Sequence, residues 1–215
     1  GVRFAYEDVG DAQLALLKNL DTLRELDLSG TQVTDAGLIR LAKLTNLQRL
    51  SLDYTDVTDL GLRELEDLVD LRQLGLIGTG VTDEGLAVVE SMQDLERLRL
   101  SSTGVTDDGL RFLEGRGSLL ELLLDDTGVT DDGVARLEDS REMRVLGLYG
   151  TRLTDEGMEM IGHFRHLVII DIGDTAITIK GLEYLKGLEE LEELYLDRTV
   201  VGDESIGIVS GMPVL

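Results

Sequence analysis

The chain has 215 residues, of which 42% are hydrophobic, and it contains no cysteine, which excludes disulfide-stapled caps in this segment. Its 43 Asp plus Glu outnumber its 20 Lys plus Arg, so the formal net charge is −23. A field of this sign repels phosphate backbones and anionic membrane surfaces. It argues against nucleic-acid binding and favours a basic protein or peptide as partner. No apolar run approaches the ~20 residues that span a bilayer, which argues against membrane insertion.

One frame of 24 residues repeats along the chain. Its first clear copy starts at Leu23 and reads L-x-x-L-x-L-x-x-T-x-V-T-D-x-G-L-x-x-L-x-x-L-x-x. The threonine in the middle of the frame recurs at Thr31, Thr55, Thr79, Thr103, Thr127, Thr151, Thr175 and Thr199. Self-similarity at a fixed period of this length predicts a solenoid.

The repeats define the expected domain. We predict a single repeat domain over residues 1–215, with eight repeats from about residue 23 and a partial repeat over 1–22. Val2 and Phe4 fit the strand positions of that partial repeat, and Leu215 is the first leucine of another copy. We therefore expect the chain to be a piece of a longer protein.

The first half of each repeat is predicted to be a short strand. In the first copy Leu26, Asp27 and Leu28 alternate with period two, so both leucines should point inward and Asp27 outward. The equivalent triplets begin at Val2, Leu50, Leu74, Leu98, Leu122, Leu146, Ile170 and Leu194. Because each strand follows the same connection, the strands should form a parallel sheet.

The second half of each repeat is predicted to be a short helix. Thr34 or Asp35 can cap its first N–H groups, and Leu38, Leu41 and Leu44 follow the spacing of one buried stripe. Packed helices need ~8–10 Å between axes, about twice the strand spacing. The repeats should therefore bend into a horseshoe arc with strands on the concave face and helices on the convex face.

The frame resembles the leucine-rich-repeat family along essentially the whole chain. Its T-D-x-G-L segment is most similar to the helix-bearing subclass with Cys or Asn where this chain has Thr, as in F-box-associated and some bacterial repeats. The resemblance implies a right-handed α/β solenoid that binds a protein or peptide through its concave sheet and has no catalytic activity. An alternative is a structural or targeting segment of a larger enzyme or a ubiquitin-ligase-like adaptor. The sequence leaves the compartment and the oligomeric state open.

An acidic column accompanies the helix starts. It consists of Asp35, Asp59, Asp83, Asp107, Asp131, Asp155 and Asp203, thickened by Glu84, Asp108, Asp132, Glu156 and Glu204, and it breaks at Ile179 and Lys180. Helix capping with a favourable helix-dipole interaction is the structural interpretation. The alternative is a calcium-stabilised surface protein, because hard cations favour stacked carboxylates. The chain lacks the G-G-x-G-x-D calcium repeat, so we predict no metal site.

The sequence contains no catalytic constellation. His163 and His166, the only histidines, lie three residues apart around the expected core residue Phe164, with no cysteine and no distinctive carboxylate partner. Zinc binding or acid–base catalysis would need further ligands or an orienting group. We predict no enzyme activity and no cofactor.

The outward strand positions vary between repeats, and one group of them predicts a binding patch. Leu123, Val145, Tyr149 and Ile169 are apolar or aromatic where water is expected, with charged residues beside them. An aromatic anchor in an apolar cluster with a charged rim is the composition of a protein-binding hot spot. The predicted patch comprises Arg97, Arg99, Glu121, Leu123, Asp125, Asp126, Val145, Tyr149 and Ile169.

The core is expected to be thinnest where two repeats lose their last large apolar residue. Arg116 and Ser140 stand where other repeats place residues such as Leu44 and Leu68. We therefore predict that the segment 114–118 is the most mobile of the helix-to-strand connections.

Overall fold

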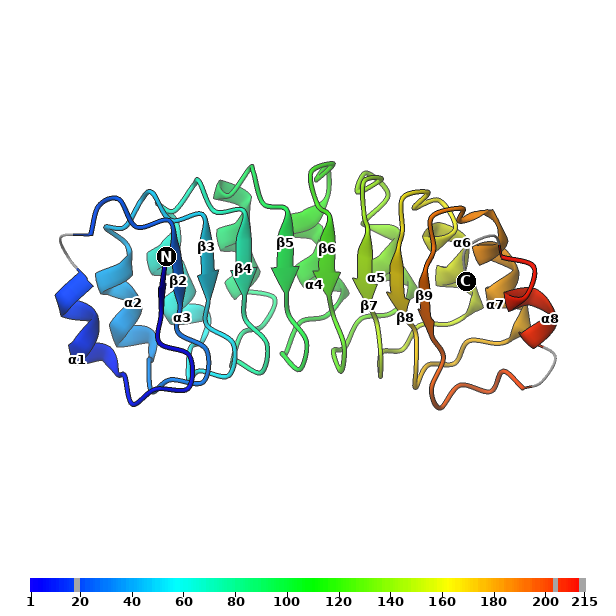
Figure 1. Ribbon diagram of the computed structural model, residues 1–215, viewed down its shortest axis with the longest axis horizontal. Coiled ribbons are helices and arrows are strands. Elements are labelled where there is room, and N and C mark those ends of the chain that lie inside the picture. The colour runs from blue at the N-terminus through cyan, green and yellow to red at the C-terminus, as the bar shows by residue number, and fades with distance from the viewer. Residues whose placement is uncertain (18–19, 203–204, 213–215) are drawn as a thin grey trace. The chain divides into compact units, whose positions relative to one another are not determined.

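The computed structural model describes residues 1–17, 20–202 and 205–212. It divides into two compact units, Gly1–Gly104 and Val105–Leu215, here called the N-terminal and C-terminal units. Each consists of strand-and-helix repeats (Figure 1). Asp203, Glu204 and Leu215 lie outside the described residues, and the single domain over 1–215 stays a prediction.

The N-terminal unit contains five parallel strands in chain order. Equivalent residues of neighbouring strands pair directly, as Leu26 does with Leu50. The strands are β1 (Val2–Arg3), β2 (Glu25–Asp27), β3 (Arg49–Ser51), β4 (Gln73–Gly75) and β5 (Arg97–Arg99). The helices are α1 (Asp11–Leu14), α2 (Asp35–Leu41) and α3 (Asp59–Leu62), with 3₁₀ segments η1 (Ala15–Leu17), η2 (Arg63–Leu65) and η3 (Gly85–Ser91).

The C-terminal unit repeats this arrangement, with four parallel strands in chain order. They are β6 (Glu121–Leu123), β7 (Val145–Gly147), β8 (Ile169–Asp171) and β9 (Glu193–Tyr195). The helices are α4 (Asp107–Leu110), α5 (Asp131–Ala135), α6 (Asp155–Ile161), α7 (Ile179–Glu183) and α8 (Ser205–Val209), with 3₁₀ segments η4 (Arg111–Leu113) and η5 (Tyr184–Gly187). The predicted α/β repeat fold is confirmed in both units.

Strands β2–β9 begin one residue earlier than the predicted triplets, whereas β1 begins at Val2 as predicted. Glu25 pairs with Arg49 before the first inward leucine of either strand. At the other end, the Leu28 N–H donates to the Ser51 carbonyl oxygen at 2.9 Å, so the last leucine of the triplet still continues the hydrogen bonding. Alternation of hydrophobicity locates the inward residues but not the outward residue with which pairing starts.

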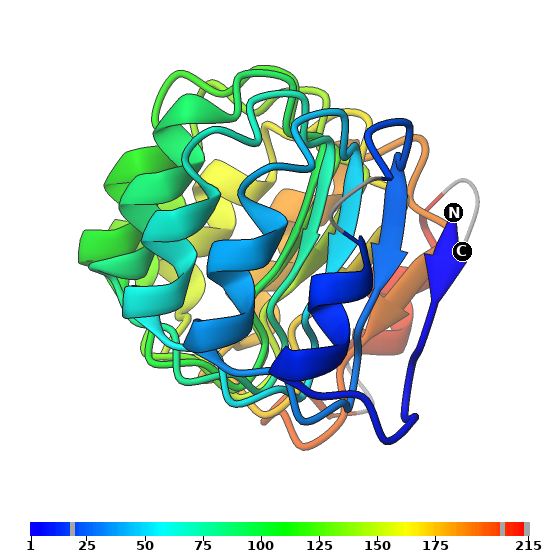
Figure 2. The same ribbon diagram turned by 90° about the vertical axis from the view of Figure 1, so that its left-hand side faces the viewer.

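The core lies between the strands and the helices, which form separate layers (Figure 2). In the first complete repeat Leu26, Leu28, Val33, Leu38 and Leu41 are all 0–1% exposed. Burying each large aliphatic side chain contributes ~1.5–3 kcal/mol, so the repeated apolar positions dominate the driving force for folding. The helices cover one face of each unit's strands and leave the other face exposed.

The recurring threonines satisfy a backbone carbonyl in the turn that follows each of strands β2–β9. The Thr31 hydroxyl donates to the Leu28 carbonyl oxygen at 2.6 Å, and each equivalent threonine makes the same bond at 2.6–2.7 Å. Thr31 is only 6% exposed, so its hydroxyl satisfies a carbonyl that lies away from solvent. These threonines therefore serve the architecture of the repeats.

The acidic column joins consecutive repeats. Thr34 rather than Asp35 caps its helix, because its Oγ1 accepts the Ala36 N–H at 3.3 Å. Asp11 of the preceding repeat accepts both the Thr34 N–H, at 2.9 Å, and the Thr34 hydroxyl, at 2.8 Å. The same pairs are Asp35 with Thr58, Asp59 with Thr82, Asp107 with Thr130, Asp131 with Thr154 and Asp155 with Thr178. Helix capping therefore does not account for these aspartates; they form an inter-repeat Asp–Thr staple.

The glycine of the T-D-x-G segment makes room for this staple. A Cβ on Gly133 would clash with the Asp107 carboxylate that holds Thr130. The three residue types also disappear together. Where Ile179 replaces the aspartate, the following repeat has Gly202 in place of the threonine and Ser205 in place of the glycine. This joint loss indicates that Asp, Thr and Gly serve one interaction.

The positions of Arg116 and Ser140 are buried although neither residue is apolar. Arg116 is 8% exposed and Ser140 is 0% exposed, and the Ser140 hydroxyl donates to the Arg116 carbonyl oxygen at 3.0 Å. Between η4 and Arg116, Gly115 adopts a φ of +77°, a conformation that favours glycine. Polar side chains thus occupy the place of two leucines.

We predict that amides in the segment 114–118 exchange with deuterium faster than those of the equivalent connection, residues 43–46. The physical reason is the smaller apolar area buried under Arg116 and Ser140, which lowers the cost of local opening. Native-state hydrogen exchange resolved by mass spectrometry measures both segments in one sample. Equal protection of the two connections would contradict the prediction.

Candidate functional site

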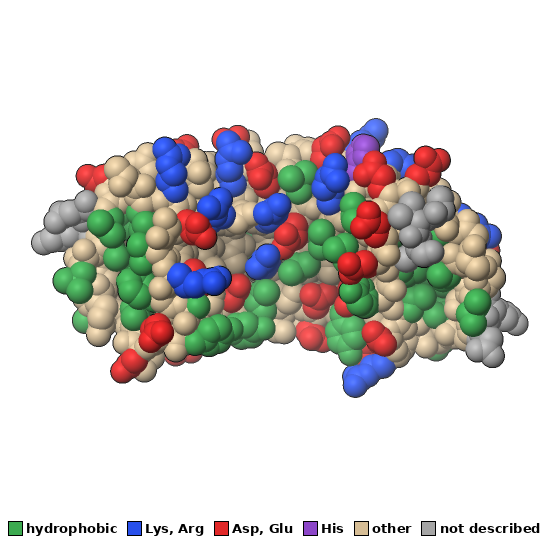
Figure 3. Space-filling model, viewed as in Figure 1, with side chains coloured by type: hydrophobic (Ala, Val, Ile, Leu, Met, Phe, Trp, Pro, Cys, Tyr) green, Lys and Arg blue, Asp and Glu red, His purple; other side chains and the backbone are tan. Residues whose placement is uncertain are grey.

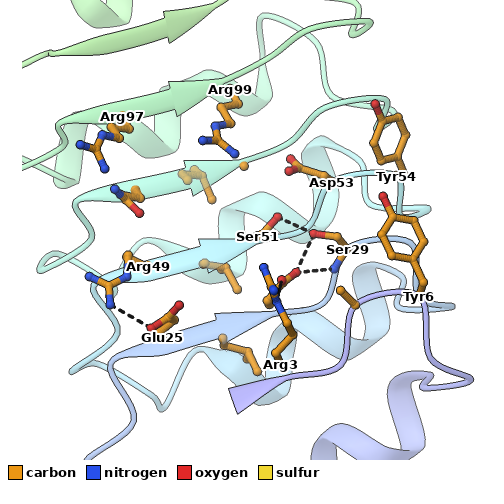
Figure 4. A pocket seen from close by; sticks show the side chains of 17 residues that line it. Arg3, Tyr6, Glu25, Ser29, Arg49, Ser51, Asp53, Tyr54, Arg97 and Arg99 are labelled. Atoms are coloured by element: carbon orange, nitrogen blue, oxygen red, sulfur yellow. Dashed lines mark hydrogen bonds and ion pairs between the residues drawn. The ribbon is translucent and has the colours of Figure 1, made fainter. Parts of the chain in front are cut away.

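The exposed face of strands β1–β5 contains a hollow of about 580 Å³ (Figure 4). All of its lining residues belong to the N-terminal unit. The charged and aromatic side chains that line it are those of Arg3, Tyr6, Glu25, Asp27, Arg49, Asp53, Tyr54, Arg97 and Arg99. We call it the N-terminal hollow.

Two carboxylates of the hollow are engaged with the chain itself. Asp53 is only 8% exposed, and its Oδ1 accepts the Ile77 N–H of the next repeat at 2.9 Å. The Oδ1 of Asp27 accepts the Ser29 N–H at 3.1 Å and the Ser29 hydroxyl at 2.6 Å. Burial alone would raise the pKa of Asp27, but the hydrogen bonds from Ser29 and Arg3 together lower it. Asp27 therefore stays ionised and Asp53 stays close to the backbone.

The arginines extend further into solvent than these carboxylates. The side chain of Arg3 is 82% exposed while it donates to Asp27 Oδ2 at 2.6 Å, and that of Arg49 is 50% exposed while it donates to Glu25 Oε2 at 2.8 Å. This bond to Arg49 and the charge of its guanidinium lower the pKa of Glu25. Figure 3 shows Lys and Arg side chains gathered over the strands of the N-terminal unit. The accessible charges of the N-terminal hollow are thus its guanidinium groups and one carboxylate, that of Glu25, whose side chain is 47% exposed.

Two tyrosines border the hollow where β1 and β3 end (Figure 4). Tyr6 and Tyr54 have positive φ angles of 61° and 58°, a region that is rare for bulky residues. Their rings lie over Gly30 and Gly78 of the next repeats, where an added Cβ would meet ring atoms. Tyr6 is 73% exposed and Tyr54 is 56% exposed. Both rings are therefore available to a ligand.

The predicted patch is distributed over both units. Arg97 and Arg99 line the N-terminal hollow, whereas the other seven residues belong to the C-terminal unit. There, Val145 pairs in register with Ile169, and Glu121 lies beside Val145 on the neighbouring strand. The structure thus brings together two of the three aliphatic residues of the patch and one charged neighbour.

The remaining patch residues follow the strands toward their ends. Leu123 pairs with Gly147, and the Tyr149 ring lies against Gly173. Asp125 Oδ1 accepts the Tyr149 N–H at 3.0 Å, and Asp126 is exposed with a positive φ of 52°. The four apolar side chains of the patch are half-buried rather than fully exposed, because neighbouring strands cover part of each.

A carboxylate near this patch is expected to weaken the fold at neutral pH. Burial, together with repulsion from Asp125 and Asp197, raises the pKa of Asp171 although it accepts the Gly173 N–H at 2.9 Å. The folded chain therefore binds this proton more readily than the unfolded chain, and stability is lost as the pH rises through the raised pKa. We expect Asp171→Asn, which keeps the hydrogen-bond acceptor, to melt at a higher temperature than the wild type at neutral pH.

Asp27→Asn is the control of opposite sign, because the pKa of Asp27 is lowered in the fold. It should melt below the wild type at neutral pH, and this difference should fade as the pH falls through the lowered pKa. The gain of Asp171→Asn should vanish near the unfolded Asp pKa of about 3.9. Melting curves of the three proteins from pH 7 down to this range measure both trends. A pH-independent gain for Asp171→Asn would contradict the charge argument.

The two histidines line a separate hollow of about 620 Å³ near the helix ends of the C-terminal unit. Contrary to the sequence interpretation, His166 has a carboxylate neighbour, since its Nδ1 lies 2.8 Å from Glu190 Oε1. Glu190 lies 24 residues away, in the next repeat, so spacing within one repeat does not predict this contact. Among the described residues, no group of three or more His, Cys, Asp or Glu is arranged to hold a metal ion.

The predicted patch does not include the other exposed arginines and tyrosines of the N-terminal hollow, which are Arg3, Tyr6, Arg49 and Tyr54. All four are polar or aromatic residues at outward positions, whereas the patch was predicted from apolar residues on adjacent strands. The sequence feature that could have identified three of them is a spacing of two repeats, which separates Tyr6 from Tyr54 and Arg49 from Arg97. No helix within residues 1–17, 20–202 and 205–212 has the length and hydrophobicity to cross a membrane.

Solved structures similar to this chain share its fold. An internalin (inlF) from Listeria monocytogenes has a TM-score of 0.73 at 21% identity, covering 92% of this chain and 62% of its own. Internalin C2 from the same organism has a TM-score of 0.70 at 24% identity, covering 96% and 83%. A plant peptide hormone receptor, RGFR1 in complex with RGF2, has a TM-score of 0.62 at 20% identity, covering 93% and 32%. The chain thus spans less than two thirds of the internalin inlF and of the receptor.

Sequence comparison identifies the repeats themselves. No curated protein matches the chain. Residues 21–64 match the family model for two copies of the leucine-rich repeat, and residues 91–113 match a model for a single leucine-rich repeat. Leucine-rich repeats are typical of protein-binding modules and are not typically enzymes. With these matches, residues 21–64 and 91–113 are leucine-rich repeats, and both units have the corresponding repeat fold.

Proposed function

We propose that the chain is a non-catalytic module that binds a protein or peptide through the exposed face of its strands. The observation that carries the proposal is the N-terminal hollow, where exposed arginines and tyrosines stand on a floor of buried leucines. The core, the recurring threonines and the Asp–Thr staples account for the repeated residues of the fold. They leave Tyr6, Arg49 and Tyr54 without a comparable role in stability.

A second contact on the same face is proposed in the C-terminal unit, around Leu123, Val145, Tyr149 and Ile169. Val145 and Ile169 present adjacent, half-buried aliphatic side chains. Burial of such partly exposed apolar area is a usual source of affinity at protein interfaces. The receptor similar to this chain was solved in complex with RGF2, which favours a protein or peptide ligand over a small molecule.

Affinity capture with four immobilised proteins tests the proposal. They are the wild type, a hollow variant (Arg49→Ala with Tyr54→Ala), a patch variant (Leu123→Asp with Tyr149→Ala) and a helix-side control (Ile39→Ala with Arg63→Ala). Ile39 is 57% exposed on α2, and Arg63 makes only an exposed ion pair with Glu84, so the control should remain folded.

We expect the wild type and the helix-side control to retain the same protein, and at least one face variant to lose it by tenfold or more. Circular dichroism melting curves verify that all four proteins are folded. Equal retention by all four would mean that the exposed face does not bind the partner. Absence of any specific capture would favour a segment whose role depends on other parts of a longer protein.

A further inference from the structure

Two pairs of like residues in the N-terminal hollow are each separated by two strands. Arg49 and Arg97 occupy the same row, with Gln73 of β4 between them in register. At the opposite side of the hollow, Tyr6 and Tyr54 alternate with Gly30, over which the Tyr6 ring lies. Figure 4 shows the two arginines along one side of the hollow and the two tyrosines along the other.

This spacing sets a distance that a ligand must match. Parallel strands lie ~4.8 Å apart, so side chains two strands apart start ~10 Å from one another. A polyproline II helix has three residues per turn and rises ~3.1 Å per residue, so its side chains three residues apart lie on one side, ~9 Å apart. A peptide that crosses the strands in this conformation could therefore address Arg49 and Arg97 with residues i and i+3.

The charge distribution selects acidic residues for these two places. The Arg49 side chain is 50% exposed and uses one donor for Glu25, so its guanidinium can still donate to a second carboxylate. Exposed ion pairs are weak, so a ligand carboxylate can share or replace such a partner at little cost. Asp53 is buried against the backbone of the next repeat and does not oppose a ligand at the mouth of the hollow.

The net charge limits how acidic the ligand can be. A chain with a net charge of −23 repels long polyanions such as nucleic acids. A local cluster of guanidiniums within that field favours a ligand with a few carboxylates on an otherwise neutral or basic protein. The two electrostatic effects together point to a short acidic segment of a protein.

The tyrosines supply the apolar part of the contact. Tyr6 and Tyr54 occupy a position of the repeat at which the backbone has a positive φ. In the neighbouring repeats this position is occupied by Gly30 and Gly78. Glycine adopts this conformation without steric cost, whereas an exposed tyrosine gains little from it. The exposed rings of Tyr6 and Tyr54 can stack with prolines or other apolar side chains of a peptide.

We propose that the N-terminal hollow binds a short acidic peptide segment in the polyproline II conformation. Carboxylates at positions i and i+3 pair with Arg49 and Arg97, and apolar side chains contact Tyr6 and Tyr54. The proposal rests on the function proposed above and names its ligand class. The hollow would thus prefer an acidic ligand, whereas the net charge of the chain favours a basic one.

A displayed library of random 12-residue peptides tests the proposal on the full chain. We expect the peptides retained by the wild type to be enriched in Asp and Glu spaced three residues apart. The best of them, made synthetically, should bind at least tenfold more weakly to an Arg49→Gln, Arg97→Gln double variant. Binding of this peptide to the wild type should also weaken with added salt, and when either of its two spaced acidic residues is replaced by the corresponding amide. Arg63→Gln, on the helices, serves as the matched charge control and should bind as the wild type does.

Tyr54→Gly separates binding from folding. Because glycine favours the left-handed conformation, we expect this variant to melt at the same temperature as the wild type or higher. We expect it to bind the selected peptide at least threefold more weakly. Equal peptide binding by this variant would remove the tyrosines from the proposal.

Retained peptides that are neutral or basic, or that bind the arginine variant equally well, would overturn the acidic-ligand inference. If affinity capture still depends on the exposed face in that case, the proposed binding function stands and only the ligand class is wrong. If neither a library peptide nor a captured protein depends on the exposed face, both proposals fail.

Discussion

Asp107→Ala is expected to destabilise the fold by roughly 2–4 kcal/mol. The Asp107 carboxylate accepts the Thr130 N–H at 2.8 Å and the Thr130 hydroxyl at 2.7 Å, and Thr130 belongs to the next repeat. Hydrogen bonds to a charged group contribute about 1.5–3 kcal/mol each, and partial exposure reduces this pair below the sum. Urea unfolding followed by circular dichroism measures the change. The matched control is Asp108→Ala, which removes an exposed acid next to it and should change stability by less than about 0.5 kcal/mol.

The role of the glycine can be tested in the same repeat. Gly133→Ala places a Cβ against the Asp107 carboxylate and should break the same staple. In the double variant Asp107→Ala with Gly133→Ala the clash is removed, so its loss of stability should be clearly smaller than the sum of the single losses. Strict additivity would mean that Gly133 does not act through Asp107. An equal loss for Asp107→Ala and Asp108→Ala would mean that charge alone, and not the staple, is at work.

Phe164→Ala is expected to cost about 3–5 kcal/mol. Phe164 is the largest fully buried side chain, at 0% exposed, and truncation leaves a cavity that the surrounding repeats can fill only in part. Phe164→Leu is the matched variant, because equivalent repeats carry Leu44 and Leu188. It should lose far less, about 1–1.5 kcal/mol. Equilibrium unfolding in urea compares the three proteins, and similar losses for the two variants would indicate a site that collapses without a cavity.

The sequence was sufficient to predict the fold because the apolar frame is periodic. Apolar residues recur at the positions of Leu26, Leu28 and Leu38 with spacings that are specific for a strand followed by a helix. They are buried in every complete repeat except the last, where Leu194 and Leu196 are half-buried and Ile206 is 64% exposed. The function of Asp35 was not predicted, since a helix cap and a staple require the same residue beside Thr34. The signal that separates them is the joint absence at Ile179, Gly202 and Ser205, which only a comparison between consecutive repeats uncovers.

The candidate site was less predictable than the fold. Hydrophobicity identified Val145 and Ile169, which are neighbours in register. It did not identify Arg49 and Tyr54, because a charged or aromatic residue at an outward position resembles any solvated residue until its neighbours are known. The backbone does not single out Tyr54 either, because the equivalent residue of the other repeats also has a positive φ, whether it is Gly30, Gly78 or Ser102.

The Asp–Thr staple also determines which changes of chain length the protein tolerates. Asp35 and Thr58, like Asp131 and Thr154, are separated by 23 residues, one less than the period of the frame. Deleting or duplicating a segment of 24 residues brings another aspartate to the same distance from the next threonine, so every bond of the column can form again. A deletion whose length is not a multiple of 24 moves the carboxylate away from its partner and leaves an amide unsatisfied. This fold can therefore grow or shrink by whole repeats. Duplication of a repeat lengthens the exposed surface and re-forms the same contacts between neighbouring repeats.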